Sequence, residues 1–401
     1  MPGPLEGIKV VDLTTVLMGP YATRILGDFG ADIVKVESLD GDVIRYANRG
    51  RSDGMSNLFL NNNRNKRSLA LNLKHNAGRK VLLKLAERSD VLISNVRPGA
   101  MARLGLSYTD VAGVNGKIVY VSCVGFGQRG PYAGRRAYDD LIQSMVGIPN
   151  LLHRAYGDEP KFLPSNFCDR VTALTVVNAV TAALFHRERT GDGQHVEVPM
   201  YETMVDFVMS DHLGGYTFEP PEGPAGYERI VNRNRRPYRT RDGYLALLVY
   251  SDEQWREFLA LVDRTDLIGK GMFATMNSRA DNAVEVYGFV EAAIAEKTTS
   301  DWLALLDGSD LPCAEVPELE NLFEDEHLVA VDFFKELDHP TEGRIRSTDI
   351  PSQWSESRPE VTRQAPRLGE HSREILGELG LSDDEIETMA ADDTTLLGND
   401  N

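Results

Sequence analysis

The feature that most constrains the fold is a regular alternation of short apolar segments with amphipathic ones in the first 127 residues. Segments rich in Val, Ile and Leu are typical of buried strands, and five occur here, at residues 8–13, 31–37, 68–73, 90–96 and 117–127. Residues 19–30 and 77–89 have the periodicity of helices. Strands alternating with helices indicate parallel βαβ units, so we predict an α/β fold with a doubly wound parallel sheet.

The rest of the chain indicates a second domain and a return to the first. A long apolar helix is predicted from about Asp169 to Arg189, and a stretch rich in Gly, Pro and Arg follows at 214–241. We predict three parts: the N-terminal part of a large domain (1–213), a linker with a smaller α/β domain (214–330), and a return segment with a C-terminal helix that completes the large domain (331–401).

Two stretches are expected to lie at the surface. The segment at 45–68 is rich in Asn and Arg, which favours an exposed excursion. The segment from Ser382 to Asn401 carries seven acids and no base, which is typical of a solvated, frayed end.

Composition excludes several classes of protein. The 401 residues include three scattered cysteines and eight histidines without ligand spacing, so neither a disulfide framework nor a metal site is expected. We find neither a signal core nor an apolar run of the roughly 18 residues that a membrane helix needs. The sequence therefore predicts a soluble cytoplasmic protein without a metal or a membrane contact.

Charge gives a weaker indication of the ligand. A net charge of −18 argues against nucleic acid as a partner. Residues 1–110 nevertheless hold 16 Lys and Arg against 11 Asp and Glu, a surplus of five positive charges. A basic segment in an acidic protein could meet a small anion or could arise by chance, and both interpretations stay open.

The order of the first predicted elements is similar to the start of a dinucleotide-binding domain. A strand, a turn, a helix and a strand ending in Glu37 occur in the right order. The turn contains Gly19 alone, whereas a pyrophosphate site needs several glycines for close backbone approach. NAD is therefore not expected, and Glu37 is interpreted as an ordinary acid at a strand end.

Asp169 lies at the predicted start of the long apolar helix. It could cap the helix by accepting backbone N–H bonds, which local sequence favours. Alternatively, a carboxylate held ionised at the positive end of a helix suits a nucleophile.

Several segments together resemble the class III CoA-transferase family, which includes formyl-CoA and carnitine CoA-transferases and α-methylacyl-CoA racemases. The matching pieces follow the family order at residues 5–37, 65–106, 120–144, 191–204, 238–247, 310–316, 339–346 and 365–376. The resemblance implies coenzyme A as substrate and product, an acyl-CoA and a small carboxylic acid as partners, and an interlocked homodimer. It also implies that Asp169 is the covalent nucleophile.

The resemblance implies a coenzyme A site as well. Val16, Leu17 and Met18 would border the pantetheine and thiol, and Leu71 and Lys74 the adenosine end. The remaining residues would lie along the nucleotide (Asn95, Val96, Arg97 and Arg103) or border the site from the far side (Arg136, Ala137, Tyr138 and Asp139). Without the family, each Arg is interpreted as a solvated surface side chain and Tyr138 as a half-buried core ring.

The sequence departs from the family at three points. Ser38 stands where formyl-CoA transferases carry an arginine, and a glycine-rich lid is not evident, so formate or oxalate is not the expected acceptor. Tyr138 stands where the racemases have a histidine, and a phenol with a pKa near ~10 is a poor base. Transfer is therefore favoured over racemisation, and the third interpretation is a non-catalytic binder of CoA esters.

Overall fold

The computed structural model describes residues 2–398, and the chain forms two compact units. Unit 1 comprises Met1–Pro149, Phe162–Ser210 and Ala330–Asn401, and unit 2 comprises Asn150–Lys161 and Asp211–Val329. The chain therefore leaves unit 1 twice and returns to it twice.

Unit 1 is built on a seven-stranded sheet in the order β12-β3-β2-β1-β4-β5-β6. All strand pairs are parallel except β12 with β3. The bounds are β1 Lys9–Leu13, β2 Asp32–Glu37, β3 Lys66–Leu71, β4 Val91–Ser94, β5 Val119–Val124, β6 Gln194–Pro199 and β12 Thr395–Leu396. The predicted α/β class with a dominantly parallel sheet is confirmed.

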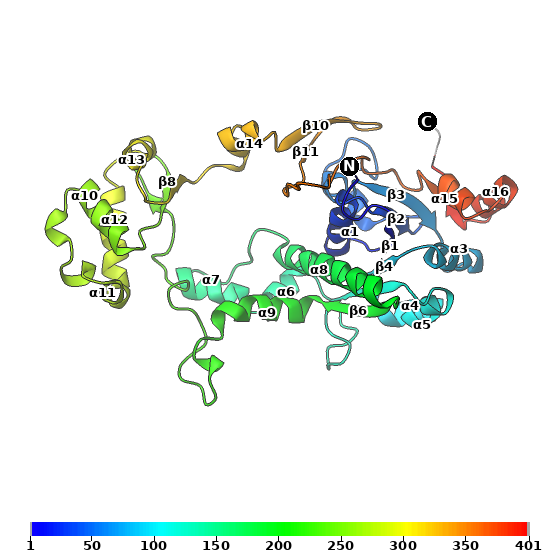
Figure 1. Ribbon diagram of the computed structural model, residues 1–401, viewed down its shortest axis with the longest axis horizontal. Coiled ribbons are helices and arrows are strands. Elements are labelled where there is room, and N and C mark those ends of the chain that lie inside the picture. The colour runs from blue at the N-terminus through cyan, green and yellow to red at the C-terminus, as the bar shows by residue number, and fades with distance from the viewer. Residues whose placement is uncertain (1, 399–401) are drawn as a thin grey trace. The chain divides into compact units, whose positions relative to one another are not determined.

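Alternation of side chains places helices on both faces of this sheet. Val11 and Leu13 of β1 join a core formed by the helices α3 (Asn76–Glu87), α5 (Tyr108–Val114), α15 (Ser372–Glu378) and α16 (Asp383–Ala391). Asp12 points the other way and contacts Thr23 of α1 (Met18–Asp28). Helix α1 packs against α8 (Phe167–Thr190), which also covers β5 and β6. Figure 1 shows the two groups of helices on opposite sides of the strands.

The other elements of unit 1 connect or cover these layers. A hairpin of β10 and β11 precedes the C-terminal helices, and α7 starts in unit 1 and continues into unit 2. Their bounds are α2 Asn57–Asn62, α4 Pro98–Leu104, α6 Asp139–Met145, α7 Ile148–Tyr156, α9 Met200–His212, β10 Phe334–His339 and β11 Gly343–Thr348. Helix α9 ends in unit 2, and α14 (Glu326–Ala330) belongs to unit 2 except for its last residue.

Unit 2 has its own core. Its antiparallel sheet has the order β7-β8-β9, and the helices α10, α12 and α13 contribute to an apolar cluster that includes Trp255, Phe258 and Trp302. The bounds are β7 Tyr238–Arg239, β8 Tyr244–Leu247, β9 Cys313–Glu315, α10 Asp252–Leu261, α11 Met276–Asp281, α12 Ala283–Ile294 and α13 Thr299–Leu306.

One expectation about the surface holds only for residues 46–54, which are exposed or half-buried, and a second is wrong. In the Asn- and Arg-rich segment, Arg45 and Phe59 are fully buried, because Arg45 forms a two-pronged ion pair with Glu37 at 2.7 and 2.8 Å. Glu37 is thus a buried anchor and not an ordinary strand-end acid. The acidic C-terminal segment is structured through Leu397, because Ile386 is buried and β12 pairs with β3. Residues 399–401 of that prediction lie outside the described part.

One further expectation needs correction. By length and composition, helix α8 could cross a membrane. In the structure, however, 44% of its apolar 18-residue stretch is buried. Its contacts with α1, β5 and β6 are those of a core helix, and the core helix of a globular protein can have the same length and composition.

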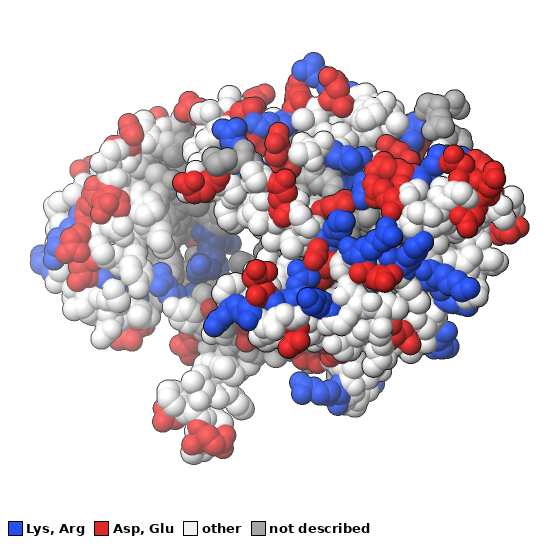
Figure 2. All heavy atoms as spheres, turned by 45° about the vertical axis from the view of Figure 1, so that its right-hand side comes forward, with Lys and Arg blue, Asp and Glu red and all other residues white. Residues whose placement is uncertain are grey.

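The charged residues are mixed on the face shown in Figure 2, where Lys and Arg lie among Asp and Glu.

Candidate active site

The strand order reverses between β1 and β4, which is where open parallel sheets bind ligands. Leu13 and Ser94 pair at the carboxyl ends of these strands, so the loops after them meet. Asn95 joins the loops because its amide accepts from the Thr15 N–H at 3.0 Å and donates to the Thr15 carbonyl at 2.8 Å. The structure therefore brings together two predicted groups, Val16–Met18 and Asn95–Arg97.

The loop between β1 and α1 is held from beneath by a buried carboxylate. Val16 has a φ of 70°, which is unusual for a β-branched residue, and its N–H donates to Asp42 at 3.0 Å. Asp42 in turn pairs with the fully buried Lys35 at 3.0 Å, and Lys35 also donates to the Thr14 carbonyl. Sequence reasoning did not identify Asp42 or Lys35, because neither lies in a recognisable motif.

Asp12 forms the second anchor of this loop. It accepts hydrogen bonds from Thr14 and Thr23 and pairs with the buried Lys66 at 3.1 Å. Burial opposes ionisation of Asp12, but Lys66, Lys35 and the two hydroxyls outweigh that cost and lower its pKa to about 2. Burial lowers the pKa of Lys66 to about 8, so at neutral pH the ion pair beneath the start of α1 is predominantly charged.

Asp169 lies in the first turn of α8 but does not cap it. The N-cap is Asn166, so the capping interpretation is wrong. The N–H of Asp169 instead donates to Asp139 at 2.9 Å, and the other oxygen of Asp139 accepts from Gln143 at 2.6 Å. Asp139 is 7% exposed and begins α6. A second carboxylate therefore supplies the acceptor at the start of α8.

The close carboxylates change the acidity of the candidate nucleophile. Burial, and then the charge of Asp139, raise the pKa of Asp169 to about 7, against the opposing effect of Arg170. The alternative interpretation, a carboxylate kept ionised by the helix end, does not hold, because burial and a like charge both raise the pKa of Asp169. Near neutral pH the protonated and ionised forms of Asp169 are therefore both populated.

Arg170 connects the start of α8 to α1 and α2. Its guanidinium lies over the ring of Tyr21 at 4.3 Å and donates to Asn62 at 2.6 Å. Tyr21 belongs to the first turn of α1. The first turns of α8 and α1 are therefore neighbours, which places Asp169 on the same side of the sheet as the loop of Val16–Met18.

The other predicted residues lie further from this cluster or at the surface. Leu71 is buried at the end of β3, two strands away from β1, and Lys74 after it is exposed. Four residues are exposed and have no side-chain hydrogen bond within residues 2–398, namely Arg97, Arg103, Arg136 and the 68%-exposed Tyr138. Val96 is half-buried against the sheet core. Ala137 packs on Gly125, where an added Cβ would lie 2.3 Å from that of Ala137.

Within residues 2–398, no group of three or more His, Cys, Asp or Glu side chains could hold a metal ion.

Sequence comparison finds relatives over nearly the whole chain. Residues 5–372 match CoA-transferase family III. The human succinyl-CoA:glutarate CoA-transferase is 31% identical over 385 residues, which cover 95% of this chain and 87% of the human protein. The formyl-CoA:oxalate CoA-transferase of Streptomyces coelicolor is 33% identical over 405 residues, which cover 96% and 97% of the two chains.

Solved structures agree with this match. A hypothetical protein from Mycobacterium tuberculosis superimposes with a TM-score of 0.81 at 27% identity, covering 93% of this chain and 99% of its own. A CAIB/BAIF family protein from Brucella suis also gives a TM-score of 0.81, at 29% identity, with 94% and 100% covered.

Proposed function

The chain belongs to CoA-transferase family III and is a CoA-transferase, and from this premise we propose that Asp169 is the nucleophile that carries the exchange. The observation that supports this role is the position of its carboxyl group. It lies at the start of α8, beside the first turn of α1, and its backbone is fixed by Asp139. The proposed substrates are an acyl-CoA thioester and a free carboxylic acid.

The first half of the proposed cycle forms a covalent enzyme. A carboxylate oxygen of Asp169 attacks the thioester carbonyl, the C–S bond breaks, and CoA leaves as a thiolate with an acyl-aspartyl anhydride remaining. The thiolate then attacks the aspartyl carbonyl, and cleavage of the C–O bond releases the donor acid. The product is an aspartyl-CoA thioester. Covalent catalysis divides one difficult exchange into steps that conserve the activated carbonyl.

The second half repeats these steps in reverse with the acceptor. Its carboxylate attacks the aspartyl thioester and expels the thiolate, which then attacks the acceptor's carbonyl in the new anhydride. The new acyl-CoA leaves and the Asp169 carboxylate is restored. Because only the ionised form attacks, the raised pKa of Asp169 should limit the rate in acidic buffer.

The coenzyme A site is proposed for the residues that the family resemblance indicates. The loop of Val16–Met18 and the end of β4 meet at the reversal of strand order, which supports a site for the pantetheine there. Arg97 and Arg103 are exposed cations on or beside α4 that could contact phosphate.

We expect Arg103→Ala to weaken CoA binding about tenfold or more and to leave the affinity for a pantetheine analogue unchanged. Calorimetric titration of both ligands tests this, and equal losses would remove Arg103 from the site.

The proposed assembly is a homodimer, by analogy with the interlocked dimers of the family. A chain that passes twice between two compact units is compatible with that arrangement. Native mass spectrometry of the purified protein would test it.

The nucleophile is tested by a pair of variants. Asp169→Asn and Asp169→Ala should both lose transfer, while both keep the hydrogen bond from their backbone N–H to Asp139. A panel of acyl-CoAs crossed with mono- and dicarboxylic acids identifies the pair to assay. Transfer at the wild-type rate in the Asn variant, without deamidation, would refute the assignment. Rapid α-deuteration that depends on Asp169, with no transfer to any acid, would favour the racemase interpretation.

A further inference from the structure

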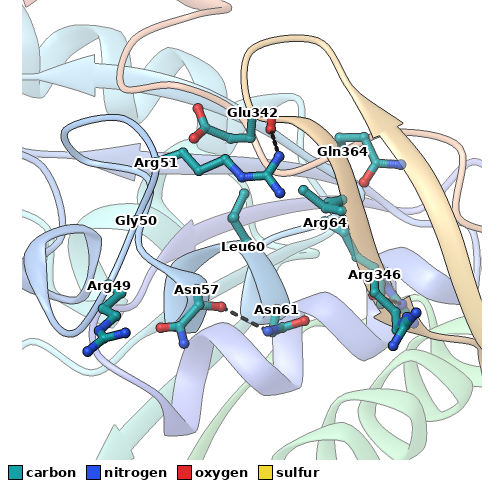
Figure 3. Close-up of a pocket in the computed structure, with 12 residues that line it drawn as sticks. Arg49, Gly50, Arg51, Asn57, Leu60, Asn61, Arg64, Glu342, Arg346 and Gln364 are labelled. Carbon is teal, nitrogen blue, oxygen red and sulfur yellow. Dashed lines mark hydrogen bonds between the residues drawn. The ribbon is translucent and has the colours of Figure 1, made fainter. Parts of the chain in front are cut away.

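The basic N-terminal segment contributes to a cavity that the proposed reaction does not use. The cavity has a volume of about 330 Å³ and lies between α2, the loop before it and the β10–β11 hairpin. None of its lining residues belongs to the proposed nucleophile or coenzyme A site. Four of them are arginines: Arg49, Arg51, Arg64 and Arg346 (Figure 3).

The arginines differ in how far their charge is already neutralised. Arg64 is buried and paired with Asp28 at 2.8 Å, and Arg346 contacts Glu336 at 3.3 Å. Arg51 donates only to a neutral group, the backbone carbonyl of Glu342. Within residues 2–398, the side chain of Arg49 has no hydrogen bond and neither Arg49 nor Arg51 has an ion pair.

The lining contains one carboxylate, which is held by neutral hydrogen-bond donors. Glu342 is 3% exposed, and its two oxygens already accept from the Ser52 N–H at 3.1 Å and the Thr341 hydroxyl at 2.9 Å. Within residues 2–398, the Glu342 carboxylate forms no ion pair with an arginine of the lining. Arg49 and Arg51 are thus the two cations of this concave site without an ion-pair partner.

The rest of the lining is apolar or carries amides. Leu60 lies between Arg49 and Arg346 in Figure 3, and Ile345 adds a second aliphatic surface. Asn57 and Gln364 contribute side-chain amides. Guanidinium forks match carboxylates in a bidentate manner, and an aliphatic floor between cations suits a short methylene chain.

We propose that this cavity binds a small α,ω-dicarboxylate, held by Arg49 and Arg51 with its methylenes against Leu60 and Ile345. A volume near 300 Å³ is at the small end of natural ligand pockets, which suits a metabolite and not a macromolecule. The proposal does not depend on Asp169, since the two sets of residues share no member.

Site-resolved protection tests the proposal on the full-length protein. The protein is treated with phenylglyoxal in the presence of malonate, succinate, glutarate or adipate. Peptide mass spectrometry then measures the rate at which each arginine is modified. At least one of these acids should slow modification of Arg49 and Arg51 severalfold, and the uncharged glutaramide should not. Arg358, an exposed arginine of unit 1 outside this cavity, should react at an unchanged rate. Unreactive Arg49 and Arg51, or equal protection by glutaramide or inorganic phosphate, would overturn the proposal.

Affinity gives the second readout. Calorimetry with the best dicarboxylate, in the Asp169→Asn background so that no turnover occurs, should show at least tenfold weaker binding after Arg49→Gln with Arg51→Gln. Arg358→Gln should bind as the parent does. If the double variant fails to fold, Arg49→Gln alone serves, because its exposed side chain makes no contact that folding needs. Unchanged affinity in a folded variant would refute the site, whatever the outcome at Asp169.

Discussion

At the scale of single residues, the proposed function depends on two carboxyl groups, Asp169 in the first turn of α8 and Asp139 at the start of α6. Asp139 accepts the hydrogen bond from the Asp169 N–H. Burial first, and then the charge of Asp139, raise the pKa of Asp169 to about 7. These two effects are separable, since an amide oxygen can accept the same hydrogen bond without carrying a charge. On this proposal Asp139 is a positioning residue whose charge adds to the effect of burial on the pKa of the nucleophile.

Asp139→Asn separates the two effects. Transfer requires ionised Asp169, so the wild-type rate should fall as the pH drops below about 7. Removing the like charge favours the ionised form and lowers the pKa of Asp169, so the acidic limb of kcat/KM against pH should move down by roughly one pH unit. A pH–rate profile of both proteins measures this. A variant whose limb stays in place would show that Asp139 does not set that pKa.

At the scale of elements, the loop between β1 and α1 is shaped by buried ion pairs. Asp42 holds the Val16 N–H and neutralises Lys35, while Asp12 neutralises Lys66. Buried charges of this kind are costly unless they are paired. Buried ion pairs thus hold the loop that we propose to face the thiol of CoA.

Asp42→Ala tests this account of the loop. It leaves the Lys35 ammonium buried without its closest carboxylate, and we expect a loss of about 3–5 kcal/mol in the free energy of unfolding. Asp42→Asn keeps an acceptor for Val16 and should lose less. Asp53→Ala, which removes an exposed acid from a nearby loop, should stay within about 0.5 kcal/mol of the parent. Urea unfolding provides the values, and an Asp42→Ala protein as stable as Asp53→Ala would contradict the account.

The same elements show what sequence could and could not predict. The strands of unit 1 were predictable because their apolar runs are short and lie between helical segments. The buried state of Arg45 was not, because its partner Glu37 lies eight residues away and reads locally as an exposed acid. The order of the C-terminal segment was missed for a similar reason. Its many acids indicate a solvated end, whereas the burial of Ile386 and the pairing of β12 with β3 depend on distant residues.

The candidate site was predictable only in part. Asp169 stood out by its place before an apolar run, but the acceptor of its N–H comes from Asp139, 30 residues away. The meeting of Val16–Met18 with Asn95 required the strand order, which no local pattern contains. Asp42 and Lys35 carry no motif, so only the folded structure reveals their role.

At the scale of the whole molecule, residues from both ends of the chain complete unit 1. The hairpin of β10 and β11 and the helices α15 and α16 come after unit 2 in the sequence, yet they belong to the large sheet domain. The two solved structures each match more than nine-tenths of this chain. The catalytic proposal therefore concerns a residue in unit 1, built from three separate stretches of sequence.

The most direct measurement is chemical trapping of the covalent enzyme. The full-length protein is incubated with an accepted acyl-CoA, treated with hydroxylamine, digested and analysed by mass spectrometry. An aspartyl thioester or anhydride at Asp169 predicts a hydroxamate on the peptide that contains it, formed only when acyl-CoA is present and absent in Asp169→Asn. Continued transfer of CoA with Asp169 unmodified, or with the hydroxamate on another residue, would contradict the central claim.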